Sequence, residues 1–254
     1  MESTNRAGFS SKIGFVLAAA ASAVGLGNIW RFPYLAAEYG GGMFLIVYLI
    51  LAVTFGFAIM ITEVSIGRMT GQSAIGAFQK LNKKFAFCGW LGLLIPVIIT
   101  PYYSVIGGWV AKYMVVYITG HGSEAATDTF FGNHIGAVGE PIVWLLIFVI
   151  VTCIVVVAGV QKGIEKASVI LMPILIALCV VISIYGLTQD GAMGGLLYYV
   201  KPALSKFSGK LVLAALGQLF YSMSLAMGIM ITYGSYMKKD NNLESSVRMI
   251  EVFD

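Results

Sequence analysis

The chain alternates long uncharged stretches with short clusters of charge. Stretches without Asp, Glu, Lys or Arg cover residues 13–30, 39–62, 85–111, 141–161, 167–189 and 211–237. Each is at least 18 residues long, which is enough for an α-helix to cross about 30 Å of hydrocarbon. Backbone polar groups in lipid must be satisfied within their own segment, so these spans should be helices. We therefore predict an all-α membrane protein with a single domain over residues 1–254, spans at roughly 13–39, 42–69, 85–117, 141–160, 166–187 and 210–237, and a seventh helix begun at 243–254.

Composition supports the membrane assignment. Of the 254 residues, 59% are hydrophobic and only 11% are charged, against about 25% charged in an ordinary soluble domain. The formal net charge of +4 does not indicate nucleic-acid binding, because the basic residues lie mostly in short loops. We expect the lipid bilayer to be a partner and nucleic acid not to be one.

The basic residues also predict the orientation. With six spans, eleven of the sixteen Lys and Arg residues fall on the side of the amino terminus. Because loops rich in Lys and Arg stay in the cytoplasm, we expect a multi-pass protein of the inner (plasma) membrane whose amino terminus is cytoplasmic.

Residues 22–34, SAVGLGNIWRFPY, interrupt the first predicted span. Gly25 and Gly27 each lower helix propensity by about 1 kcal/mol relative to alanine. Asn28 can cap a new helix start, and Pro33 is tolerated in a first helical turn. This pattern predicts a helix, an unwound patch and a second helix. The alternative is that the small residues only allow close packing of a neighbouring helix.

The sixth span has a similar interruption. Residues 218–228, QLFYSMSLAMG, gather polar and small side chains in the middle of the predicted span. Irregular backbone at membrane depth is tolerated where it lines a buried cavity or site. Half-helix amino ends attract anions and the carboxyl ends attract cations. Two interrupted spans therefore predict a site for a zwitterion and a small cation.

Glu63 lies near the cytoplasmic end of the second predicted span. A carboxylate inside the membrane is a candidate functional residue. Its natural partners would be the donors freed by unwinding of the first and sixth helices. The alternative is an interfacial side chain that reaches toward water.

Several of these motifs resemble the neurotransmitter:sodium symporter family, and in particular its bacterial sodium-dependent amino-acid transporters. The similarity follows the chain in order over most of its length. Its main elements are AVGLGNIWRFPY at 23–34, EYGGG at 38–42, Glu63 with Gly67 and Arg68, the pair Tyr102 and Tyr103, and QLFYSMS at 218–224.

The resemblance implies a five-plus-five inverted-repeat transporter fold in which helices 1 and 6 are unwound in mid-membrane. The implied function is sodium-coupled symport of an amino acid into the cell by alternating access, and no enzyme activity. This chain looks truncated after the sixth transmembrane helix. Helices 7 onward would then be needed to complete the site.

The resemblance also implies two sodium sites. The expected ligands are hard oxygen atoms, as a hard cation requires. For sodium site 1 they are Ala23, Asn28, Ser222 and Asp254, and for the partial sodium site 2 they are the carbonyls of Ala21 and Val24. Gln218, Tyr48 and Ser222 match part of the family's chloride site, but they leave chloride dependence open.

The resemblance also implies a binding site for an amino acid. Glycine at position 25, where amine-transporting relatives have an aspartate, leaves room for a carboxylate, so an amino acid is favoured over a monoamine. The apolar pocket favours a neutral hydrophobic or aromatic side chain. The substrate-binding residues would be Ala23, Gly25, Leu26, Gly27, Ile99, Tyr103, Tyr221, Ser222, Ser224, Ala226 and Met227.

Gates are implied on both sides of the substrate. Tyr103 and Tyr221 resemble the outer lid and Arg31 the outer gate, while Arg6, Phe9 and Tyr236 resemble the inner gate. Gly163 and Pro173 match a fifth-helix motif that some members unwind. The alternative for this pair is a permanent kink packed against its neighbours.

Other functions fit the sequence less well. A membrane-bound enzyme is disfavoured because no HExxH, GxSxG or P-loop pattern is present, and a channel because there is no ring of charges or carbonyl filter motif. A non-transporting fragment, or an assembly partner of a full-length transporter, is the main alternative.

Overall fold

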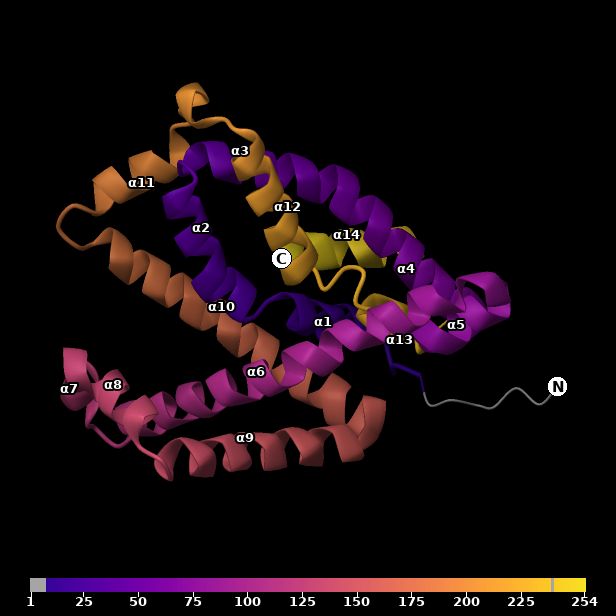
Figure 1. Cartoon of the computed structure of the whole chain (residues 1–254), viewed down its shortest axis with the longest axis horizontal. Coiled ribbons are helices and arrows are strands. Elements are labelled where there is room, and N and C mark those ends of the chain that lie inside the picture. The colour runs from indigo at the N-terminus through magenta and orange to yellow at the C-terminus, as the bar shows by residue number, and fades with distance from the viewer. Residues whose placement is uncertain (1–7, 239) are drawn as a thin grey trace.

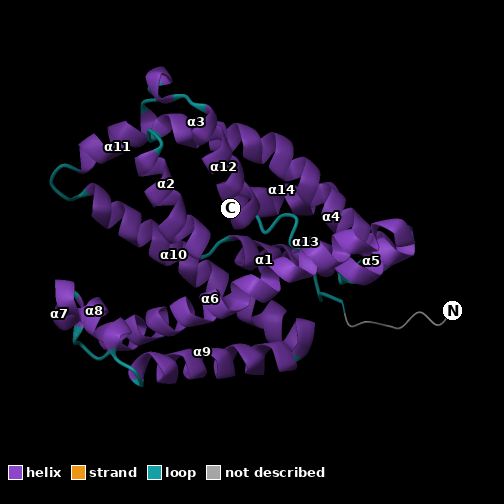
Figure 2. Cartoon of the chain, in the orientation of Figure 1, coloured by secondary structure: helices purple, strands orange, loops and turns teal. Residues whose placement is uncertain are grey.

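The computed structural model describes residues 8–238 and 240–254. Within these residues the regular structure is entirely helical (Figure 2). The α-helices are α1 Lys12–Ala23, α2 Phe32–Glu38, α3 Gly42–Leu51, α4 Phe57–Thr70, α5 Ala74–Leu81, α6 Ala86–Ile118, α7 Gly122–Ala125, α8 Asp128–Gly136, α9 Glu140–Val157, α10 Lys166–Leu187, α11 Ala192–Val200, α12 Gly209–Ser222, α13 Ile229–Ser235 and α14 Leu243–Phe253. Short π-helical segments are η1 Gly27–Arg31, η2 Ala52–Gly56 and η4 Val160–Glu165, and the 3-10 turns are η3 Lys83–Phe85 and η5 Leu204–Lys206.

Several helices in the described residues are long and apolar enough to cross a membrane. There are four of them: Gly42–Thr70, Lys83–Ile118, Glu140–Val157 and Val160–Leu187. A fifth span results if the bent pair Lys12–Ala23 and Gly27–Glu38, which meet at 48°, is counted as one. The sixth predicted span is divided into α12, of 14 residues, and α13, of 7 residues. Neither half reaches the length of a span, because residues 223–228 between them are not helical.

The core lies where α1, α3, α4, α12, α13 and α14 meet. Phe15, Phe44, Met60, Leu219 and Ile250 are fully buried there. In Figure 1, α12 and α14 lie beside α3 and α4, and α6 runs along α9 at the other side of the molecule. Helix α13 packs on α4. The closest approach uses glycines, since a Cβ on Gly67 would stand 1.9 Å from the carbonyl oxygen of Ile231.

Helices α6, α9 and α10 leave most of their apolar surface uncovered. Of the most apolar 18 residues in each of the corresponding spans, only 11%, 0% and 6% are buried. Soluble monomers rarely expose a large contiguous apolar surface. These helices therefore have the surface expected of membrane-spanning segments.

Candidate functional site

The first helix is interrupted where the sequence predicts it. Ser11 caps the start of α1, because its side chain accepts a hydrogen bond from the Gly14 amide. The helix ends at Ala23, Val24 is extended with ψ of 105°, and helical structure resumes as the π-helical segment η1 at Gly27. The opening amides of a helix have no partner within it, so this break exposes backbone donors and acceptors near Asn28.

The second interruption follows α12. Residues 223–228 are not helical, and Ser224 and Ala226 have positive φ angles of 53° and 59°. Such angles cost an L-residue about 1–2 kcal/mol. Gly228, at φ 70°, then precedes α13. Conformations of this kind persist where the surrounding structure enforces them, often at functional sites.

Polar contacts join the two interruptions to α14. The Asn28 amide nitrogen donates to the backbone oxygen of Asp254 at 3.1 Å and to its Oδ1 at 3.0 Å. The Ser222 hydroxyl donates to Asn28 Oδ1 at 3.1 Å and also contacts Asp254 Oδ1. Tyr48 donates to Asp254 Oδ2 at 2.7 Å. Three of the four predicted residues of sodium site 1 thus lie in direct contact.

The remaining ion-site residues lie close to the same break. Ala23 is buried at the end of α1, Val24 lies in the break, and Ala21 is exposed in the last turn of α1. Gln218, which is fully buried, donates to the Gly27 carbonyl at 2.9 Å. In the described residues, no three His, Cys, Asp or Glu side chains lie close enough to bind a metal ion together. A cation here would be held by carbonyl, amide and hydroxyl oxygens with Asp254, which is a suitable donor set for a hard monovalent ion.

Two further contacts fix the second interruption. Ser224 donates to the Ser22 carbonyl at 3.0 Å, which ties the two breaks together. Glu63, only 8% exposed, accepts the Ala226 amide on Oε1 at 2.7 Å, while its Oε2 is buried without a hydrogen-bond partner. Glu63 therefore contacts the unwound sixth helix, and its carboxylate does not reach toward water.

A cavity of about 320 Å³ lies beside the breaks. Its wall includes five of the predicted substrate-binding residues: Ile99, Tyr103, Tyr221, Ser224 and Met227. The other predicted substrate residues lie outside it. Leu26 lines a neighbouring cavity of about 530 Å³ with Arg31 and Tyr221, and Ala226 lines a third with Glu63. Ala23 and Ser222 are the last residues of α1 and α12, Gly25 lies in the first break, and Gly27 begins η1.

The three residues predicted for the outer gate lie close together, around Tyr221. The Tyr103 and Tyr221 rings lie 6.1 Å apart between centroids. The Arg31 guanidinium carbon stands 4.9 Å from the centre of the Tyr221 ring, a cation–π distance. Tyr221 lines both cavities, while Tyr103 lines the first and Arg31 lines the second.

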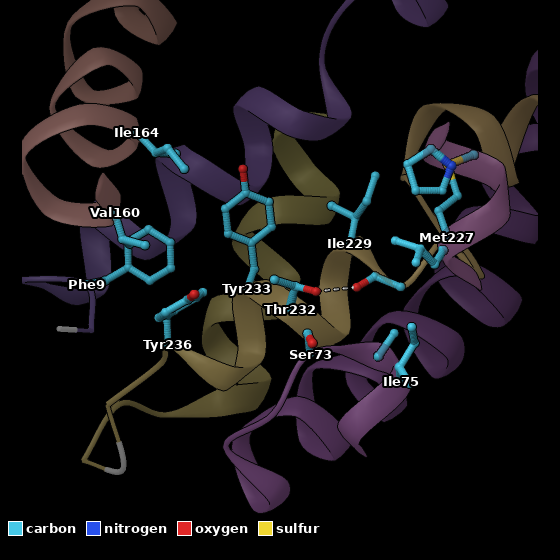
Figure 3. Close-up of a pocket in the computed structure, with 14 residues that line it drawn as sticks. Phe9, Ser73, Ile75, Val160, Ile164, Met227, Ile229, Thr232, Tyr233 and Tyr236 are labelled. Atoms are coloured by element: carbon cyan, nitrogen blue, oxygen red, sulfur yellow. Dashed lines mark hydrogen bonds between the residues drawn. The ribbon is translucent and has the colours of Figure 1, made fainter. Parts of the chain in front are cut away.

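On the opposite side of the breaks, Phe9 and Tyr236 are in contact. The Phe9 amide donates to the Tyr236 carbonyl at 3.1 Å, and their rings lie 6.4 Å apart in an edge-on arrangement. Both line a separate cavity of about 300 Å³ (Figure 3). Arg6, the third predicted inner-gate residue, lies outside the described residues.

The two residues of the fifth-helix motif lie in backbone of different kinds. Gly163 lies in the π-helical segment η4, where an added Cβ would stand 1.9 Å from the Val155 carbonyl oxygen. Pro173 lies inside α10, which is continuous over Lys166–Leu187. The irregular backbone is thus located at Gly163 and not at the proline.

Sequence reasoning did not identify Ser22 or Glu165. Ser22 lies one residue from a predicted sodium ligand, but nothing in its type indicates a contact with Ser224. Glu165 stands in a charged loop sequence, between Lys162 and Lys166, that is typical of an exposed interface. In the structure it is only 5% exposed and accepts hydrogen bonds from Ser10. No local sequence signal distinguishes it from a solvated loop residue.

Comparison with solved structures finds a protein of the same architecture. The crystal structure of MhsT in complex with L-phenylalanine matches with a TM-score of 0.90 and 40% sequence identity. The match covers 98% of this chain and 58% of that protein. At this level of identity the fold and the order of its helices are shared over nearly the whole chain.

Sequence relatives show the same partial coverage. A sodium-dependent transporter of Bacillus subtilis, YhdH, is 36% identical over 247 residues, 95% of this chain and 55% of its own length. One from Methanocaldococcus jannaschii is 36% identical over 96% of this chain and 52% of its own length. A sodium-dependent neutral amino acid transporter of Rattus norvegicus is 26% identical over 98% of this chain and 39% of its length. The chain spans about half the length of the relatives it matches.

The sequence profile of the Sodium:neurotransmitter symporter family matches residues 6–131 and 125–253. These segments contain both helix interruptions, the Asn28–Ser222 contact and the apolar cavity. The named relatives are sodium-dependent transporters and not enzymes, which removes the membrane-bound enzyme from consideration. The chain belongs to the sodium:neurotransmitter symporter family.

Proposed function

We propose that this chain carries the first part of a symporter that couples sodium entry to uptake of a neutral hydrophobic or aromatic amino acid across the plasma membrane. The observation that carries the proposal is the contact of Asn28, Ser222 and Asp254 at two interrupted helices, directly beside an apolar cavity. Helices 7 onward would supply the remaining ligands, in keeping with the half-length match to relatives.

In the proposed sodium site, a bound ion takes the place of hydrogen-bond donors that now contact the site's oxygen atoms. The Ser222 hydroxyl donates to Asn28 Oδ1 and to Asp254 Oδ1, and the Asn28 amide nitrogen also donates to Asp254 Oδ1. A sodium ion among Asn28, Ser222 and Asp254 would replace these donors. The Ser222 hydroxyl would rotate so that its lone pairs face the ion, and the Ala23 carbonyl would be a further ligand. The Asp254 carboxylate offsets the positive charge. A second sodium ion would use the carbonyls of Ala21 and Val24 with ligands from later helices.

The proposed substrate site uses the adjacent backbone. A carboxylate group fits the amides of Leu26 and Gly27, since helix amino ends attract anions. The ammonium group would face the carbonyl oxygens freed at the two breaks. The substrate side chain would occupy the cavity of about 320 Å³, whose Ile99, Tyr103 and Met227 favour an apolar group. That MhsT was solved with L-phenylalanine supports the same class of amino acid.

The test is binding of labelled amino acids in sodium and in potassium. It uses this chain and this chain joined to the carboxyl-terminal half of the Bacillus subtilis relative. We expect sodium-dependent binding of phenylalanine or leucine in the joined protein. Absence of any sodium effect in both proteins would refute the proposal, and binding by the joined protein alone would show that later helices complete the site.

Asn28→Ala tests the ligand set. Loss of one oxygen ligand should lower sodium affinity by at least about tenfold, which corresponds to roughly 1.4 kcal/mol. Asn133→Ala is the matched control, because Asn133 is exposed on α8, away from both interruptions. Equal sodium affinity of the two variants would exclude Asn28 from the site.

A further inference from the structure

A second apolar cavity lies next to the proposed substrate cavity. It measures about 300 Å³ and is lined by Phe9, Val160, Ile164, Tyr233 and Tyr236, among others (Figure 3). It shares a wall with the substrate cavity, because Pro96, Met227 and Ile229 line both. A molecule leaving the substrate cavity past these three side chains would enter this inner cavity.

Residues 8–10, the amino-terminal strap, close one side of the inner cavity. Phe9 is fully buried. Its ring lies 5.8 Å from that of Tyr233 in a stacked arrangement and 6.4 Å from that of Tyr236. Figure 3 shows Phe9 and Val160 at one end of the cavity and Met227 at the other. Removing the strap would therefore open the cavity at the end opposite Met227.

The strap is attached to η4 by one buried carboxylate. Glu165 is 5% exposed. Its Oε2 accepts the Ser10 amide at 2.8 Å, and its Oε1 accepts the Ser10 hydroxyl. The carboxylate lies directly over Gly14 of α1, where an added Cβ would stand 1.8 Å from Oε1. Hydrogen bonds to a charged group are stronger than neutral ones, and burial protects these from competition by water.

Two additional contacts support the strap at exposed positions. The Gln161 side chain donates to the Gly8 carbonyl. The Lys238 ammonium donates to the Ser10 carbonyl at 2.6 Å. Both side chains are exposed, so solvent competes with these bonds. The strap is also held through its backbone, since the Phe9 amide donates to the Tyr236 carbonyl at 3.1 Å. Among the side chains that bind the strap, Glu165 is the buried one, and it lies in a π-helical segment, a backbone type that often marks functional positions.

We infer that Glu165 is a positioning residue for transport: its paired hydrogen bonds to Ser10 hold the strap, and with it Phe9, over the inner cavity, and their release opens that cavity to solvent. The role of Glu165 in transport rests on the proposed function. The contacts themselves predict opening of the inner cavity whether or not an amino acid binds.

The experiment measures the rate at which a membrane-impermeant maleimide modifies a cysteine in the inner cavity. Thr232→Cys supplies the reporter, since Thr232 lines this cavity, in a background where Cys88, Cys153 and Cys179 are replaced by alanine. Thr100→Cys, in the substrate cavity, is the reference position. Glu165→Ala should increase modification at position 232 by about tenfold, as expected for loss of hydrogen bonds to a charged group, and leave position 100 unchanged.

Two further variants separate positioning from a general loss of structure. Glu165→Gln can still accept the Ser10 amide, so its rate should stay within about threefold of the parent, since a neutral hydrogen bond is weaker than a charged one. Ser10→Ala removes the hydroxyl bond alone and should give an intermediate rate. Faster modification at both positions in Glu165→Ala, or an unchanged rate at position 232 in both Glu165→Ala and Ser10→Ala, would overturn the inference. Because the labelling needs neither sodium nor substrate, failure of the symport proposal would leave this result interpretable.

Discussion

The contact between α4 and α13 offers a sharp test of the packing that holds the broken sixth helix. Gly67 and Gly234 lie on the facing surfaces of these helices. An added Cβ at Gly67 would stand 1.9 Å from the Ile231 carbonyl oxygen, and one at Gly234 would stand 2.4 Å from the Val64 carbonyl oxygen. In both cases the obstructing atom belongs to the backbone, so no side-chain rotation can relieve the overlap.

The loss of stability expected for Gly67→Ala follows from the 1.9 Å distance between the added Cβ and the Ile231 carbonyl oxygen. Contacts of a Cβ below 3.0 Å are essentially never observed, so the two backbones must separate by about 1 Å. Overpacking costs about 1–3 kcal/mol, and a rigid obstruction places this site at the upper end. Alanine recovers about 1 kcal/mol through its higher helix propensity. We expect a net loss of about 2 kcal/mol, or about 4–8 °C in melting temperature for a chain of this size.

The assay is thermal unfolding in detergent with a fluorogenic maleimide, which reports exposure of the half-buried Cys88 and Cys179. Gly217→Ala is the control. Gly217 also lies in a helix, α12, but an added Cβ there meets nothing within 4 Å, so its melting temperature should stay unchanged or rise. The double variant Gly67→Ala with Gly234→Ala should lose less than the sum of the single losses, because one separation relieves both overlaps. A Gly67→Ala melting temperature equal to that of Gly217→Ala would refute the reasoning.

Three other substitutions test the breaks and a cap by the same melting assay. Glu63→Ala leaves the Ala226 amide without its 2.7 Å acceptor and should cost about 1–3 kcal/mol, whereas Glu63→Gln keeps an acceptor oxygen; equal losses in the two variants would contradict this role. Ala226→Gly removes a Cβ at φ 59° and should stabilise by up to about 1 kcal/mol; a clear loss would show that the methyl group itself packs usefully. Asn242→Ala removes the cap that accepts the Ser245 amide at 2.9 Å at the start of α14 and should cost about 1 kcal/mol; an unchanged melting temperature would show that α14 does not depend on it.

The helix interruptions could be predicted from sequence because their causes are local. Gly25, Gly27 and Asn28 lower helix propensity within a few residues, and the chain leaves the helix at residue 24. The second break was expected from the run of small and polar residues at 218–228. Its backbone was not: Ser224 and Ala226 have positive φ angles, although neither residue type favours them. Tertiary contacts such as Ser224 with Ser22 enforce that geometry.

The parts of the site that could not be predicted depend on contacts between distant segments. Glu165 and Ser10 are 155 positions apart, and their pairing becomes visible only when the fold brings η4 against the strap. The π-helical segments likewise have no compositional signature at 52–56 or 160–165. For the fifth helix, the motif of Gly163 and Pro173 left both unwinding and a permanent kink open. The structure has irregular backbone at Gly163, whose missing Cβ allows close approach to the Val155 carbonyl, and α10 is continuous through Pro173.

The π-helical segment η2 has a mechanical consequence for the sixth helix. It joins α3 to α4, and the Cβ position of its Gly56 lies 2.8 Å from the Met223 sulfur, so the two irregular segments face each other. Helix α12 contacts α3, and α13 contacts α4. The two halves of the broken helix, α12 and α13, thus pack on α3 and α4 respectively, and the break between them lies beside η2. A tilt of α13 away from α12 would therefore move α4 as well, and the helix formed by α3, η2 and α4 would bend at residues 52–56.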